Sequence, residues 1–209
     1  MTYDFTLISA LSIIAPLIAG AIAFRRLDFS LRLIVVMIFL VALGELAASI
    51  LFESKVNNMF IYHAHTYVEF YFLIIFYYRL FRRRFSQKIA EVFAIAFLVI
   101  SCLLYLRDSI YEFNSAQRYV EMILLIFIMY QFLYELDKFS SRVRILKSPF
   151  FWLTVGYVIY FAGTLLLFLL QQKFVESGFN GYWVVHGIFN IFLNLVLTFV
   201  LWTGRERYS

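Results

Sequence analysis

Seven stretches of mostly apolar residues run along the chain, separated by short polar connections. A helix needs about 20 such residues to cross the hydrocarbon core of a bilayer, and each stretch is close to that length. No connection is long enough to hold a soluble domain. The sequence therefore predicts an all-α, polytopic membrane protein in which residues 1–209 form a single transmembrane domain of seven helices. The predicted spans are 5–24, 31–52, 59–80, 88–106, 116–136, 149–171 and 181–203.

The amino-acid composition excludes most other classes of protein. Hydrophobic residues make up 64% of the chain and charged residues 15%, whereas a typical soluble domain is about 45–50% apolar and about 25% charged. Two prolines and eight glycines are too few for a disordered or linker-rich chain. Cys102 is the single cysteine, so no internal disulfide can form.

Most of the 18 lysines and arginines lie in alternate connections. Cytoplasmic loops of membrane proteins carry the excess of positive charge, so this asymmetry predicts an outer N-terminus and a cytoplasmic C-terminus. We expect a multi-pass protein of the bacterial inner membrane. The net charge of +5 then reflects loops that contact anionic lipid headgroups, and no nucleic-acid partner is expected. The basic residues on the predicted outer side are Lys55, Arg107, Arg118 and Lys173.

A small set of ionisable and amide side chains interrupts the apolar spans. Such groups are costly in hydrocarbon, and by default they mark a functional site. In the predicted orientation they come from four spans and gather at one level in the outer half of the membrane. This pattern predicts a polar, net acidic cavity that opens to the exterior. The predicted ligand-binding residues are Glu45, His65, Glu69, Glu121, His186, Asn190 and Asn194.

These side chains also have a structural interpretation. Any single glutamate can be protonated and hydrogen-bonded to a neighbouring helix, and the spacing of Asn190 and Asn194 favours hydrogen bonds between helices. His63 points about 200° away from His65 on a regular helix, so we expect it at the membrane boundary.

Two further pairs are predicted to be structural. Gln131 and Glu135 lie toward the inner end of the fifth predicted span, where Glu135 can reach the interface. Gly156 and Gly163 are seven residues apart on one face of the sixth span. Because small residues let helices approach closely in lipid, this pair predicts helix packing.

Histidine together with carboxylate is a ligand set that suits a divalent metal such as zinc. His65, Glu69 and His186 could supply three ligands, with Glu45 or Glu121 as a fourth. A metal with an open coordination position would allow hydrolysis of a lipid amide or ester. In this respect the chain resembles seven-helix zinc hydrolases of the ceramidase type, but its last span has only one histidine. The sequence contains no HExxH motif, and we identify no catalytic residue.

The last two predicted spans carry a pattern of aromatic, small and polar residues. It reads Phe151-Trp152 … Tyr157 … Tyr160-Phe161-Ala162-Gly163 … Trp183 … His186 … Asn190 … Asn194 … Trp202. This block resembles the last helix pair of the seven-helix input regions of bacterial signalling proteins. The resemblance covers about the last quarter of the chain and implies a sensing role.

A binding or sensing role fits more of the pattern than catalysis does. We therefore expect a receptor-like or accessory module that binds a small ligand or cation. Because no output domain is expected within these 209 residues, the signal would pass by helix movement to a membrane or cytoplasmic signalling partner. A metal-dependent intramembrane hydrolase and a small transporter are the alternatives.

Overall fold

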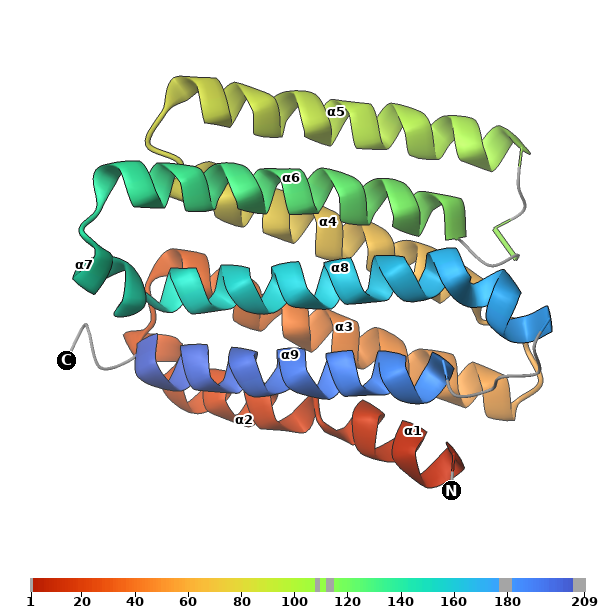
Figure 1. Cartoon of the computed structure of the whole chain (residues 1–209). Helices are drawn as coiled ribbons and strands as arrows, with labels where there is room; N and C mark the ends of the chain where they lie inside the picture. The colour runs from red at the N-terminus through yellow and green to blue at the C-terminus, as the bar shows by residue number, and fades with distance from the viewer. Residues whose placement is uncertain (1, 108–109, 112–114, 177–181, 205–209) are drawn as a thin grey trace. The chain divides into compact units, whose positions relative to one another are not determined.

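The computed structural model describes residues 2–107, 110–111, 115–176 and 182–204, and the regular structure in these ranges is helical (Figure 1). The helices are α1 (Thr2–Leu11), α2 (Ile14–Ala23), a 3₁₀ turn (Phe24–Arg26), α3 (Phe29–Glu53), α4 (Met59–Leu80), α5 (Arg84–Arg107), α6 (Ser115–Phe139), α7 (Arg142–Leu146), α8 (Pro149–Glu176) and α9 (Tyr182–Gly204). The all-α prediction is confirmed for these ranges.

Seven segments of the described chain are long and apolar enough to cross a membrane. They agree with the predicted spans to within four residues at each end, and the protein is a multi-pass membrane protein that contacts the lipid bilayer. The segments are Leu7–Arg26, Phe29–Glu53, Met59–Leu80, Arg84–Leu106, Ser115–Phe139, Pro149–Leu170 and Val184–Gly204. The large apolar side chains on their surfaces, such as Phe52, Ile95 and Leu106, are exposed in the isolated chain and suit contact with lipid tails.

The first span is two helices rather than the one continuous helix that its apolar length suggests. α1 ends at Leu11 and α2 begins at Ile14. Pro16 explains the break, because proline has no N–H to give to the carbonyl four residues earlier and its ring clashes with that carbonyl. The Ser12 carbonyl instead accepts a 3.3 Å bond from the N–H of Ala15.

The chain divides into two compact units, and the boundaries fall inside α3 and α6. We call residues 1–35 and 136–209 the terminal unit and residues 36–135 the central unit. The prediction of one domain over residues 1–209 stays a prediction.

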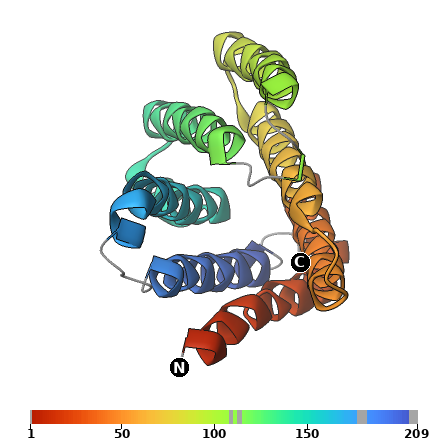
Figure 2. The same cartoon turned by 90° about the vertical axis from the view of Figure 1, so that its right-hand side faces the viewer.

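In the terminal unit, α9 lies between α8 on one side and α1 and α2 on the other (Figures 1 and 2). Glycines make the α8–α9 contact close. A Cβ atom added to Gly156 would lie 2.7 Å from Cγ1 of Val196, and one added to Gly163 would collide with the ring of Phe189. The predicted packing role of these two glycines is confirmed.

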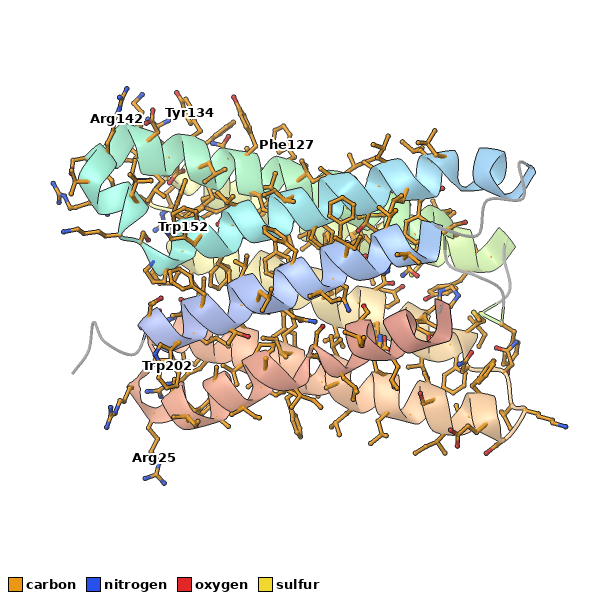
Figure 3. All side chains as sticks on the ribbon, turned by 60° about the horizontal axis from the view of Figure 1, so that its bottom comes forward. Arg25, Phe127, Tyr134, Arg142, Trp152 and Trp202 are labelled. Atoms are coloured by element: carbon orange, nitrogen blue, oxygen red, sulfur yellow. The ribbon has the colours of Figure 1, made fainter. Side chains whose placement is uncertain are left out.

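One end of the terminal unit combines basic and tryptophan side chains. Arg25, Arg142, Trp152 and Trp202 lie toward this end (Figure 3). Tryptophan is enriched at membrane–water interfaces, and basic residues flank the spans there. The combination is typical of an interfacial belt.

The central unit contains α4, α5, most of α3 and nearly all of α6. Aromatic rings fill the contact between α4 and α5, where the centroids of Phe70 and Phe97 are 3.9 Å apart. The buried stripe of α6 is Gln117, Glu121, Met122, Leu125, Ile128, Met129, Phe132 and Glu135. Its polar members define the two ends of the unit that are described next.

Candidate functional site

Arg118 joins two carboxylates at one end of the central unit. Its Nη1 donates to Oε2 of Glu69 and to Oε2 of Glu121, each at 2.7 Å. Glu69 belongs to α4, whereas Arg118 and Glu121 are three residues apart on α6 and so share a face of that helix. Charge-assisted bonds of this length are among the strong ones. They link α4 to α6 within the central unit.

Glu121 is the most enclosed member of this group. Its side chain is 0% exposed, compared with 14% for Glu69 and 19% for Arg118. Oε2 is bound to Arg118, but Oε1 has no hydrogen-bond partner among the residues that the structure describes. Because a buried polar atom without a partner is costly, such atoms call for a specific explanation.

His65 lies one helical turn before Glu69 and packs against α3. A Cβ atom added to Gly44 would collide with Nε2 of the imidazole, so glycine is required there for the ring to sit against the α3 backbone. Nδ1 of His65 lies 3.6 Å from Oε1 of Glu45, whose side chain is half exposed. Nε2 has no hydrogen-bond partner within the described ranges.

A second polar group lies beside α4 at the same end of the central unit. His63 Nδ1 is 3.0 Å from Oε1 of Gln117 and 3.3 Å from the hydroxyl of Tyr105. Nε2 of Gln117 donates in turn to Oγ of Ser101 at 3.3 Å. His63 is 8% exposed, so this α4 side chain is buried against α5 and α6, and its place at the membrane boundary stays a prediction.

Arg118 is the main residue of the site that sequence reasoning missed. It was counted only as a basic residue of the outer side and was given no part in the site, whereas it pairs with two of the predicted ligand-binding glutamates. The spacing of three residues between Arg118 and Glu121 was the available signal. The predicted acidic cluster therefore contains a cation of its own.

Glu135 organises the opposite end of the central unit. Its carboxylate accepts a 2.9 Å bond from the backbone N–H of Arg82 and a short one from the hydroxyl of Ser86. Ser86 Oγ also accepts from Nε2 of Gln131 at 3.1 Å. A carboxylate at the start of a helix satisfies unpaired N–H groups and interacts well with the helix dipole. These contacts agree with the structural role predicted for Gln131 and Glu135.

Asn190 and Asn194 bind the break between α1 and α2 within the terminal unit. Nδ2 of Asn190 donates to the Ser9 carbonyl at 3.2 Å and to its hydroxyl at 3.1 Å. Nδ2 of Asn194 donates to Oγ of Ser12 at 2.7 Å. This pairing supports the helix–helix interpretation of the two asparagines, and their contact with a ligand stays a prediction.

The remaining predicted ligand residue, His186, also belongs to the terminal unit. Its ring makes edge contacts with Tyr160 and Phe168, at centroid distances of 6.3 and 6.4 Å. The structure joins Glu69 to Glu121 through Arg118 and places Glu45 beside His65, and both pairs lie in the central unit.

The predicted metal ligands His65, Glu69 and His186 are divided between the two units. Within the described residues, no group of three or more His, Cys, Asp or Glu side chains is placed to hold a metal ion. A zinc site stays a prediction.

No protein-family model, curated protein or solved structure matches the chain. The resemblance of the last two spans to sensor input regions therefore remains a prediction from the sequence.

Proposed function

We propose that the protein is a receptor-like or accessory module that binds a small cationic ligand at the Arg118 end of the central unit. The observation that carries the proposal is Glu121, which is wholly buried, with one carboxylate oxygen bound to Arg118 and the other left without a partner in the described residues. A carboxylate oxygen in that state accepts either a hydrogen-bond donor or a cation.

The charge of the surroundings favours a cation. Glu45, Glu69 and Glu121 supply three carboxyl groups against the one guanidinium of Arg118. His65 adds a ring nitrogen without a described partner. In a region of low dielectric constant such groups attract a positive ligand more strongly than they would in water.

The proposed orientation puts this site on the outer side of a bacterial inner membrane. Within the central unit, Arg79, Arg82, Arg83 and Arg84 cluster at the α4–α5 connection, which is the end opposite the start of α4 and α6. The excess of basic residues at that end supports its cytoplasmic placement.

Coupling to a partner is supported by the two helices that hold the site. α4 carries Glu69 and leads into the connection that contains Arg82, while α6 carries Glu121 at one end and Glu135 at the other. A ligand that changes the distance between α4 and α6 would therefore bear on the contact of Glu135 with Arg82. A partner that binds the basic cytoplasmic connection would then respond to the ligand through this contact.

Thermal unfolding of the purified protein in lipid nanodiscs tests the proposal. The probes are Zn²⁺, Ca²⁺, methylammonium and methylguanidinium, added singly over a range of concentrations. We expect at least one to raise the midpoint of unfolding of the wild type and of Glu53→Gln, an exposed carboxylate that serves as the matched control. Glu121→Gln should lose that rise. The proposal is wrong if no probe stabilises the wild type, or if Glu121→Gln responds as the wild type does.

A further inference from the structure

The two glutamates hold the guanidinium of Arg118 in the way that a binding site holds a ligand. A single guanidinium nitrogen lies 2.7 Å from a carboxylate of α4 and 2.7 Å from a carboxylate of α6. The group that fills the space between the helices therefore comes from α6 itself. Arg118 lies within one turn of the start of α6 at Ser115.

The oxygen that Arg118 leaves without a partner shows what chemistry would complete this arrangement. Oε1 of Glu121 is buried and needs a donor. A primary ammonium has three N–H donors and a small guanidinium has five or six, so either could bind Glu69 and Glu121 and also reach Oε1. A cation without N–H groups would supply charge but no such bonds.

We infer that the space between Glu69 and Glu121 is a recognition site for a guanidinium or primary ammonium group, and that Arg118 is a tethered occupant that competes with the ligand. This inference rests on the proposed function and names the ligand class and its control. A group tethered next to its site has an effective concentration in the millimolar range, so it competes strongly with a free ligand.

The Arg118 side chain can reach the membrane interface when it is displaced. Its side chain is 19% exposed, and long basic side chains near the end of a span extend to the membrane interface. The displaced guanidinium would leave Glu69 and Glu121 to the ligand. The exchange makes the α4–α6 contact depend on the occupant.

Arg118→Ala tests the inference, because it removes the tethered occupant and leaves both carboxylates. The dissociation constant of methylguanidinium is measured by thermal-shift titration in nanodiscs, with Arg25→Ala, an exposed arginine, as the matched control. We expect Arg118→Ala to bind methylguanidinium at least about tenfold more tightly than the wild type and the control do. Arg118→Ala combined with Glu121→Gln should lose this gain.

Tetramethylammonium separates this inference from the proposed function, because it carries the same charge without N–H donors. Stabilisation by methylguanidinium and methylammonium but not by tetramethylammonium supports the ligand class. Equal stabilisation by all three overturns the ligand class and leaves cation binding in place. If no cation binds the wild type, the proposed function fails. Tight binding of methylguanidinium by Arg118→Ala alone would still support the recognition site between Glu69 and Glu121.

A second variant covers the case in which Arg118→Ala does not fold. Arg118→Lys keeps a positive charge between the helices but loses the planar guanidinium and its paired donors. We expect its affinity for methylguanidinium to exceed that of the wild type. Affinity equal to or below that of the wild type in the folded variants overturns the role of Arg118 as a competitor.

Discussion

The imidazole of His65 on α4 rests against Gly44 on α3, at a position where no side chain could stand. The contact is the reason that α3 and α4 can approach each other at the level of the candidate site. It also brings the histidine ring to within 3.6 Å of Glu45, the residue that follows the glycine.

Gly44→Ala is therefore expected to destabilise the protein. Alanine favours a helix over glycine by about 1 kcal/mol, so a change at an uncrowded position would be stabilising. Here the methyl group meets the ring, and overpacking typically costs about 1–3 kcal/mol. Thermal unfolding in nanodiscs shows whether the substitution lowers or raises the midpoint of unfolding. Adding His65→Ala should recover most of the loss, and an unchanged or raised midpoint in Gly44→Ala alone would contradict the contact.

Removal of Arg118 should cost much more stability than removal of its whole ion-pair group. Arg118→Met leaves the buried Glu121 and the partly exposed Glu69 without their cation, and breaking a buried pair on one side costs about 3–5 kcal/mol. The triple variant Glu69→Gln, Arg118→Met and Glu121→Gln has no unpaired charge in this group, so its free energy of unfolding should be closer to that of the wild type. Urea or thermal unfolding of the two variants checks this order; a triple variant less stable than Arg118→Met would be evidence against it.

Glu135→Gln should loosen the start of α5. The amide keeps the shape of the side chain but loses the charge that Arg82 N–H and Ser86 contact. Hydrogen bonds to a charged group are worth about 1.5–3 kcal/mol, so we expect a loss of that order. Hydrogen exchange should speed up most at residues 82–87. Glu91→Gln, an exposed carboxylate of the same helix, serves as the control and should change little.

Asn194→Ala and Ser12→Ala should show coupled effects on stability. The 2.7 Å bond between these side chains joins α9 to the break in the first span. Coupling energies of such bonds within membranes average about 0.6 kcal/mol and reach about 1.7 kcal/mol. A double-mutant cycle by thermal unfolding measures the value here. Strictly additive effects of the two single substitutions would show that the bond adds no stability. Ser54→Ala, which changes an exposed serine, is the neutral reference.

The spans could be predicted from the sequence because they depend on one property, the length of an apolar stretch, which the bilayer fixes. The break at Ser12 was missed for the same reason: hydropathy averaged over a window does not register that Pro16 removes a hydrogen bond.

The candidate site was predicted in part. Helical spacing placed His65 and Glu69 on one face, but it gave no sign that His63 is buried against α5 and α6. Periodicity separates the faces of a helix without showing what covers them, and α4 has partners on more than one side: His65 packs against Gly44 of α3, whereas His63 bonds to Gln117 of α6. The part that Arg118 plays in the site was missed because a basic residue near a span end is interpreted as a topology determinant.

The bonds of the Asn190 side chain reach across 181 residues to Ser9. The ion pair of Arg118 with Glu69 spans only 49 residues. During synthesis, the contacts of the central unit can thus form once α6 has emerged. The Ser9 carbonyl can bond to Asn190 only after α9 has been synthesised, which happens much later. Since domains fold as their chain emerges, the Arg118 end of the central unit would be assembled first. The broken first span would be secured last, and any delay in inserting α9 would leave Ser9 and Ser12 without their asparagine partners.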